Sequence, residues 1–265
     1  MSCLFLVALL AVSAPALAEP LRSVFIEELT SPELAAAVHA GKTTILIPIG
    51  GTEQNGPHMV LGKHNVRVKV LAGRIARELD DALVAPVIAY VPEGGVNPPT
   101  GHMRYPGTIT VPSDVYRKML ESAARSFRLA GFRNIVFLGD HGDYQKDNEK
   151  VARQLDREWA KTPVRVYAIG EYYRAATDGY ARFLRERGYS DAEIGLHAGL
   201  ADTSLALAVD PRLVRPEPQP SAQITPSPPG VSGDPRRATA ELGKPGIDMI
   251  VIQSVAAIRA AIAHR

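Results

Sequence analysis

A short apolar run at residues 44–49, TILIPI, constrains the fold more than any other feature, because it ends abruptly in glycines and polar side chains. Such a run is typical of a strand that is covered on both faces, as the strands of a parallel sheet are. The stretch that follows, residues 50–66, contains four glycines, two histidines, two asparagines and one glutamate. This composition predicts a ligand site at the end of a strand.

The rest of the chain alternates between similar apolar runs and helical patterns. Further strands are expected at residues 83–91, 134–138 and 164–169. Helices are expected at residues 31–40, with Ser31 as N-cap, at 66–79, 113–129 and 249–263, before Trp159, and after Gly199. This alternation predicts an α/β fold, a three-layer sandwich whose mainly parallel central sheet carries helices on both faces.

The size of the chain suits one such domain. The chain has 265 residues, of which 46% are hydrophobic, and we expect a single domain at residues 19–265. A proline-rich arm is expected at about residues 210–235. The net charge of +2 and the aromatic content of 6% argue against a nucleic-acid partner.

The first eighteen residues have the pattern of a secretory signal peptide. Residues 4–12 are wholly apolar, and Ala16–Ala18 form an A-x-A cleavage site. The alternative is a buried N-terminal helix, since no basic residue precedes the apolar run. We therefore expect a periplasmic or secreted protein with no membrane partner after signal cleavage. Its mature chain would have no cysteine, because Cys3 lies in the signal.

Polar clusters follow each predicted strand. In a parallel sheet, ligands bind outside the carboxyl ends of the strands, so these clusters are expected to converge at one edge. Histidine nitrogens and carboxylate oxygens together suit zinc, manganese or iron. The candidates are Glu53, His64, His102, His141, Asp143 and Glu171.

Several of these residues have a second interpretation. His58 is expected to be a hydrogen-bonding residue of its Gly-Pro turn. His102 either lines a substrate pocket or fastens its own loop. Asp143 is either a ligand or a carboxylate at a helix N-terminus, and Glu171 is either an acid/base group or a surface residue. The arginines in residues 66–79 are expected to form a solvated helix face.

Five motifs carry a resemblance to a known family. Residues 44–243 resemble the creatininase (creatinine amidohydrolase) family. The motifs are Glu53–His58, Pro106–Thr108, Gly139–Asp143, His197–Ser204 and Gly233–Pro235. The resemblance implies a three-layer α/β fold, homo-oligomers that are often hexamers, and a two-metal site of zinc or manganese that hydrolyses C–N bonds.

The resemblance also implies roles for individual residues. Glu53 and His141 match metal ligands, and Asp143 matches a further ligand that is a glutamate in the family. His197 matches the catalytic histidine. Asp202 replaces a glutamate that precedes a Thr-Ser pair. Asp143 and His197 are thus the candidates for proton transfer.

Two positions depart from the family pattern. Asn55 replaces a ligating histidine, and His64 replaces a bridging aspartate. A neutral imidazole coordinates through one nitrogen and cannot bridge two ions as a carboxylate does, and an amide oxygen is a weak ligand for zinc. We therefore expect one zinc or manganese ion per chain, held by Glu53, His64 and His141 with Asp143 nearby.

The leading functional hypothesis is a metal-dependent hydrolase. Metal-activated water would cleave an amide or cyclic amide bond of a small molecule or peptide. Substrate contacts are expected from Asn55, His102, Glu171 and Asp202. The alternatives are a non-catalytic small-molecule-binding protein on the same fold and a one-metal lyase or isomerase acting on sugars.

Overall fold

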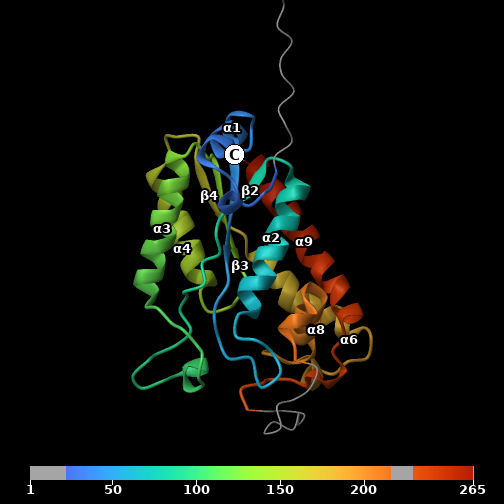
Figure 1. Ribbon diagram of the computed structural model, residues 1–265. Coiled ribbons are helices and arrows are strands. Elements are labelled where there is room, and N and C mark those ends of the chain that lie inside the picture. The colour runs from blue at the N-terminus through green and yellow to red at the C-terminus, as the bar shows by residue number, and fades with distance from the viewer. Residues whose placement is uncertain (1–21, 216–228, 265) are drawn as a thin grey trace, which may run out of the picture.

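Four parallel strands form the centre of the molecule, as predicted. The computed structural model describes residues 22–215 and 229–264, so the predicted signal peptide and half of the proline-rich arm lie outside the described residues. The strands are β1 (Thr44–Ile49), β2 (Ala82–Val84), β3 (Asn134–Gly139) and β4 (Arg165–Ala168). Their order is β2-β1-β3-β4, with Thr44 paired to both Ala82 and Asn134 (Figure 1).

Strand β2 is shorter than expected. The sequence predicts a strand at residues 83–91, but the ladder with β1 stops at Val84 and resumes only as a single bridge between Ile49 and Ile88. Pro86 lies in the gap, and proline has no backbone N–H to donate to a ladder.

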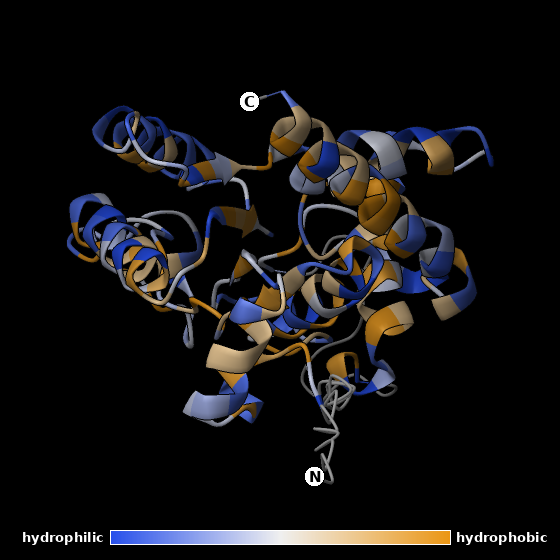
Figure 2. Cartoon of the chain, turned by 90° about the horizontal axis from the view of Figure 1, so that it is seen from above, coloured by the Kyte–Doolittle hydropathy of each residue, from blue (hydrophilic) through white to orange (hydrophobic). Residues whose placement is uncertain are grey.

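Helices cover both faces of the sheet. One face packs on α1 (Ser31–His39), α3 (Ser113–Leu129) and α4 (Gln145–Glu158). The other face packs on α2 (Lys63–Leu79), α5 (Gly170–Arg174), α6 (Tyr180–Arg185), α8 (Leu200–Val209) and α9 (Ala240–Ala263). Figures 1 and 2 show these layers. The three-layer α/β sandwich is thereby confirmed.

The alternation of side chains along β1 explains why two cores form. Ile45, Ile47 and Ile49 enter the core beneath α1, α3 and α4, whereas Leu46 enters the opposite core. Successive side chains of a strand point to opposite faces, so a continuous apolar run can bury both. The remaining short elements are α7 (Asp191–Ile194), a π-helical turn (Ala175–Gly179) and 3-10 turns at Ile26–Glu28, Gly101–Arg104, Pro211–Leu213 and Pro235–Arg237.

Helix α9 begins nine residues before the predicted start at Met249, at Ala240. Gly243, inside this helix, is required by packing, because a Cβ there would lie 1.9 Å from the carbonyl oxygen of Ser204 in α8. By length and composition α9 could cross a membrane. Its inward residues, among them Ile250 and Ile258, are fully buried in the core, which identifies it as a core helix.

Two further helix starts differ from prediction. The N-cap of α1 is Thr30 rather than Ser31, and it forms a capping box with Glu33. Helix α2 begins at Lys63, three residues before the predicted start. The earlier start places Lys63 and His64 in the first helical turn, beside the ends of the strands.

Candidate metal centre

The adjacent ends of β1 and β3 are tied together by one tyrosine. The hydroxyl oxygen of Tyr144, the residue before α4, lies 2.8 Å from the carbonyl oxygen of Ile49 and 2.7 Å from that of Gly50. The same hydroxyl accepts hydrogen bonds from the backbone N–H groups of Asp140 and His141, at 3.1 and 3.0 Å. Two strand ends that lie far apart in sequence are therefore held at a fixed separation.

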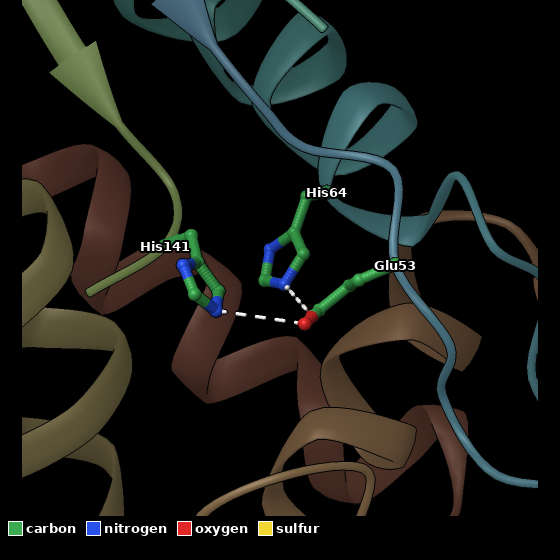
Figure 3. Close-up of side chains that lie close together, drawn as sticks. All are labelled: Glu53, His64 and His141. Carbon is green, nitrogen blue, oxygen red and sulfur yellow. Dashed lines mark hydrogen bonds and ion pairs between the residues drawn. The ribbon is translucent and has the colours of Figure 1, made fainter. Parts of the chain in front are cut away.

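Glu53 lies at the centre of the polar cluster. Its side chain is fully buried, and its Oε1 is 2.7 Å from Nε2 of His64. Its Oε2 lies 3.6 Å from Nε2 of His141 (Figure 3). The same oxygen lies 3.4 Å from Nε2 of His102. Among the described residues, Oε2 has no hydrogen-bond partner. Burial alone would raise the pKa of Glu53, but His64 and Lys63 outweigh it and hold that pKa below its usual range.

His64 is held between two carboxylates. Its Nε2 faces Glu53, and its Nδ1 lies 2.6 Å from Oδ2 of Asp140. Burial and the charge of Lys63 lower the pKa of His64, but the two carboxylates prevail and raise it overall. In this arrangement a carboxylate oxygen faces each ring nitrogen of His64 at hydrogen-bond distance.

Basic residues of α2 form a buried network beneath the cluster. Lys63 Nζ lies 2.6 Å from Oδ2 of Asp202. Arg67 bonds both oxygens of Asp140 through Nε, and Oδ1 of Asp202 through Nη1 at 3.0 Å. The expectation that the arginines of this helix form a solvated face is wrong for Arg67, which is 3% exposed. A buried guanidinium requires paired carboxylates, and two are present.

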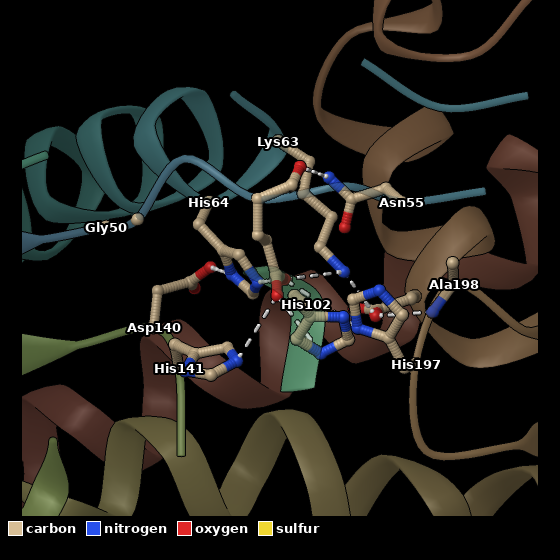
Figure 4. A network of polar contacts seen from close by, with 12 residues as sticks. Gly50, Asn55, Lys63, His64, His102, Asp140, His141, His197 and Ala198 are labelled. Carbon is tan, nitrogen blue, oxygen red and sulfur yellow. Dashed lines mark hydrogen bonds and ion pairs between the residues drawn. The ribbon is translucent and has the colours of Figure 1, made fainter. Parts of the chain in front are cut away.

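Asp202 was predicted to contact substrate. In the structure its carboxylate also accepts a hydrogen bond from the backbone N–H of Ala198 at 3.0 Å. With Lys63 and Arg67 on its other sides, Asp202 positions two cations and the turn that follows His197. Figure 4 shows Lys63 with His197 and Ala198 close by.

His102 and His197 lie together on the other side of Glu53. Their ring centroids are 4.1 Å apart. Gln54 Nε2 lies 2.7 Å from Nδ1 of His102, and His197 Nε2 lies 2.9 Å from the carbonyl oxygen of Gln54. This leaves Nδ1 of His197 facing Oε1 of Glu53 at 3.7 Å. Burial and the charge of Lys63 lower the pKa of His197 to about 4, so the ring is neutral at pH 7.

Glu93 is a member of the cluster that the sequence analysis missed. It is 1% exposed, and neither of its carboxylate oxygens has a hydrogen-bond partner within residues 22–215 and 229–264. Its Oε2 lies 3.8 Å from Nε2 of His141. Burial, with the charges of Glu53 and Asp143, raises the pKa of Glu93 to about 9. The signal was a glutamate beside two glycines at the start of a long irregular loop.

Three other predicted residues occupy distinct positions. The amide of Asn55 donates to the backbone carbonyls of Glu53 and Val60, both at 2.9 Å, so it fastens the turn that carries Glu53. Asp143 is exposed beside His141. Glu171 is not brought to the cluster: it pairs with Arg174 at 2.6 Å and lines a separate hollow between α4, β4 and α9.

His58 is a hydrogen-bonding residue, as expected, but its partner lies on α8 and not in its own turn. It is buried, and its Nε2 bonds the hydroxyl of Thr203 at 3.0 Å. It fastens the glycine-rich stretch onto α8.

The cluster opens into a cavity of about 950 Å³, whose floor includes His64, His141 and His197. Its walls come from the segment between α5 and α8, with Tyr173, Arg182 and Leu196 among the lining residues. Ligand cavities of about this volume hold drug-sized molecules.

A family model described as creatinine amidohydrolase matches residues 27–258. The chain belongs to the creatininase family. It is 29% identical over 229 residues to the mycofactocin precursor peptide peptidase of Mycobacterium ulcerans (strain Agy99), covering 76% of this chain and 78% of that protein. It is 26% identical over 201 residues to the creatinine amidohydrolase of Pseudomonas putida, covering 73% and 74%.

Solved creatininase structures match the fold closely. A crystal structure of creatinine amidohydrolase aligns with a TM-score of 0.73 at 25% identity, over 91% of this chain and 98% of that one. Other matching structures are a manganese form of creatininase and a Zn–Zn form of a creatininase variant. The resemblance found in the sequence is thus confirmed.

The residues of this creatininase-family site fit a divalent ion. Buried carboxylate oxygens of Glu53 and Glu93 that lack partners among the described residues are costly unless a cation or proton neutralises them. Histidine and carboxylate together are a zinc- or manganese-type donor set. Three groups of residues bring one ligand atom each within 4.8 Å of one another: Glu53, His64 and His141; Glu53, His102 and His197; and Glu93, His141 and Asp143.

Proposed function

We propose that this protein is a metal-dependent amidohydrolase, which cleaves a C–N bond in a small molecule or peptide. The observation that carries the proposal is the convergence of Glu53 with His141, which lines a cavity, in a chain of the creatininase family. Two relatives support the bond type, because a peptidase and an amidohydrolase both cleave amides.

Glu53 and His141 are the two proposed metal ligands whose charge states suit a divalent ion. The Glu53 carboxylate is ionised, and burial lowers the pKa of His141 to about 4, so its imidazole is neutral. A zinc or manganese ion, one per chain, would polarise the amide carbonyl and acidify the attacking water.

His197 is the proposed proton carrier. Its Nε2 is directed at the carbonyl oxygen of Gln54, so Nδ1 is the nitrogen that can accept a proton beside Glu53. A neutral ring can take a proton from water and return it to the leaving nitrogen. Asp143, exposed beside His141, is a second proton carrier in this proposal.

The test is amide hydrolysis by protein that has been stripped with chelator and then reloaded. Short peptides and cyclic amides are offered, and the release of amine is measured with and without zinc or manganese. We expect chelator to abolish turnover and the metal to restore it, and Glu53→Gln and His141→Gln to lose at least about 100-fold. Glu149→Gln, on the exposed side of α4, is the matched control and should keep full activity.

The binding-protein alternative gives the opposite result. Ligand affinity that persists in chelator, with no turnover of any amide and no effect of Glu53→Gln, would replace the hydrolase proposal by that alternative.

Secretion and self-association complete the proposal. The predicted signal at residues 1–18 supports a periplasmic or secreted protein, and the family resemblance supports a homo-oligomer as large as a hexamer. N-terminal sequencing of the exported protein should find Glu19 first, and sedimentation gives the subunit number. Full-length protein retained in the cytoplasm would contradict export.

A further inference from the structure

A buried carboxylate at Glu93 has no role in the function described so far. Glu93 lies in the loop between β2 and α3, and its backbone N–H donates to the hydroxyl of Thr110 at 3.0 Å. A second hydrogen bond between the same two segments runs from the N–H of Val111 to the carbonyl of Val91 at 3.2 Å. These two hydrogen bonds fix the backbone around Glu93 and so hold its carboxylate in the cluster.

The glycine-rich stretch leaves space for this carboxylate. Gly51 has φ +153°, and a Cβ built on it would lie 2.7 Å from Oε1 of Glu93. A side chain at position 51 would therefore occupy the position of the Glu93 carboxylate. The absence of a side chain at Gly51 therefore makes room for the Glu93 carboxylate, although the two residues lie on different loops.

His141 belongs to two groups of potential ligand atoms: one with Glu53 and His64, and one with Glu93 and Asp143. Oε2 of Glu53 lies 3.6 Å from Nε2 of His141, and Oε2 of Glu93 lies 3.8 Å from the same nitrogen. Ligand lengths of about 2.0–2.2 Å in a tetrahedral zinc site correspond to ligand-to-ligand distances of about 3.3–3.6 Å. The observed separations are close to that range, and too long for hydrogen bonds.

The contacts of His64 separate it from this set. Its Nε2 is 2.7 Å from Oε1 of Glu53, which is a hydrogen bond, and its Nδ1 is bonded to Asp140 at 2.6 Å. His64 therefore holds one oxygen of Glu53 and directs the other, Oε2, toward His141 and His102. Its geometry is that of a residue that orients a ligand.

We propose that Glu93 is a metal ligand, and that Glu53, Glu93 and His141 hold the ion while His64 positions Glu53. Two carboxylates balance the charge of a divalent cation, and the imidazole adds none. Asp143, which shares a ligand-atom cluster with Glu93 and His141, lies where it can reach the same ion. This proposal rests on the proposed function, since it assumes that the site binds a divalent ion.

The test measures metal affinity rather than activity. Wild type, Glu93→Gln, Glu93→Asp, His64→Gln and Glu149→Gln are stripped with chelator. Their zinc affinities are then measured by competition with a chromophoric chelator, and the visible spectra of their cobalt forms are recorded. Glu93→Gln should lose at least 100-fold in zinc affinity and change the cobalt spectrum. Glu93→Asp should retain part of the affinity, because it keeps a carboxylate on a shorter arm.

His64→Gln should lose about 10-fold in affinity and keep the wild-type cobalt spectrum, as expected of a residue behind the ligands. Thermal unfolding of the metal-free proteins controls for folding, and Glu93→Gln should unfold as cooperatively as wild type. Glu149→Gln should match wild type throughout.

The two levels of the proposal fail in different ways. If wild type binds zinc and Glu93→Gln binds it within threefold of wild type, the assignment of Glu93 is wrong and the proposed function stands. If His64→Gln alters the cobalt spectrum and Glu93→Gln does not, His64 is the ligand. If wild type itself takes up no ion, both the assignment and the metal-dependent function are overturned.

Discussion

The charge of a histidine that lies between two carboxylates varies with pH differently from that of a histidine that ligates an ion. His64 lies between Glu53 and Asp140, and Arg67 approaches its Nδ1 at 3.3 Å from the Asp140 side. The two carboxylates favour the charged ring, so the pKa of His64 is raised even though burial opposes this.

The raised pKa of His64 predicts how stability varies with pH. A group whose pKa rises on folding contributes fully below its unfolded value, about 6.5, and loses that contribution as the pH rises through the folded value. The free energy of unfolding of metal-free wild type should therefore fall above pH 6.5, by about 1.4 kcal/mol for each unit by which the pKa is raised. Denaturant titrations at pH 6 and pH 9 measure the change.

The matched variants are His64→Gln and His39→Gln. His64→Gln should lack this part of the decrease, while His39→Gln, at an exposed position near the end of α1, should retain it. Equal slopes in wild type and His64→Gln would show that His64 is neutral in the folded protein.

At the scale of elements, the site depends on how β1 and β3 end. Tyr144 is fully buried, and its hydroxyl contacts both strand ends through four backbone groups. The residues that follow these ends include Glu53 and His141. The separation of two proposed ligands is therefore set by a tyrosine hydroxyl that bonds backbone groups.

Tyr144→Phe should lower both stability and metal affinity. Loss of a buried hydroxyl that satisfies backbone groups costs roughly 1–3 kcal/mol, and the freed strand end should reduce zinc affinity about 10-fold. Tyr116→Phe is the control, because Tyr116 is equally buried and its hydroxyl bonds Asn148 instead, at 2.6 Å. It should lose similar stability and keep its zinc affinity; a parallel loss of affinity would contradict this role of Tyr144.

The glycine-rich turn after β1 gives a second prediction at this scale. Gly51→Ala should impose backbone strain and displace the Glu93 carboxylate, because the new Cβ would lie 2.7 Å from Oε1. Gly41→Ala imposes strain alone, since Gly41 has φ +103° and nothing within 4 Å of an added Cβ. Both variants should lose about 1 kcal/mol of stability, and only Gly51→Ala should also lose zinc affinity. Unchanged zinc affinity in Gly51→Ala would show that zinc binding does not depend on the space that Gly51 leaves for Glu93.

At the scale of the whole molecule, the proposed ion joins loops that follow β1, β2 and β3. Helix α9 contributes no residue to the cluster, but it packs in the same core as α2, and Arg74 of α2 pairs with Asp248 of α9 at 2.8 Å. Stabilisation at the strand ends should therefore extend to α9 if the described domain unfolds as one unit.

Metal binding should stabilise the entire fold. An ion at 100 times its dissociation constant raises the free energy of unfolding by about 2.7 kcal/mol. Thermal unfolding with zinc and with chelator measures the rise, and hydrogen exchange of residues 247–258 reports whether α9 shares it. Slower exchange confined to the loops around Glu53 would show that the site opens independently of the core.

Comparison of particular residues shows which features can be predicted from sequence. The position of Glu53 and His141 was predictable because each follows a buried strand, and parallel strands end at one edge. Glu93 was not predictable, because it follows a segment that leaves the sheet after Val84 and returns through a long irregular loop. Arg67 was misassigned because a basic residue on a helix usually faces water, and its partners Asp140 and Asp202 lie more than 70 residues away.

The sequence by itself determined the parallel α/β fold, the family and the edge at which the site lies, because these follow from local patterns and from short motifs. The tertiary structure decided which atoms meet: that His64 is enclosed by two carboxylates, that Asn55 fastens a turn, that Glu171 lies elsewhere, and that Glu93 enters the cluster. The physical reason is that hydrogen bonds and ion ligation require side-chain atoms within a few ångströms. Such distances depend on loop paths and helix starts that no local pattern specifies.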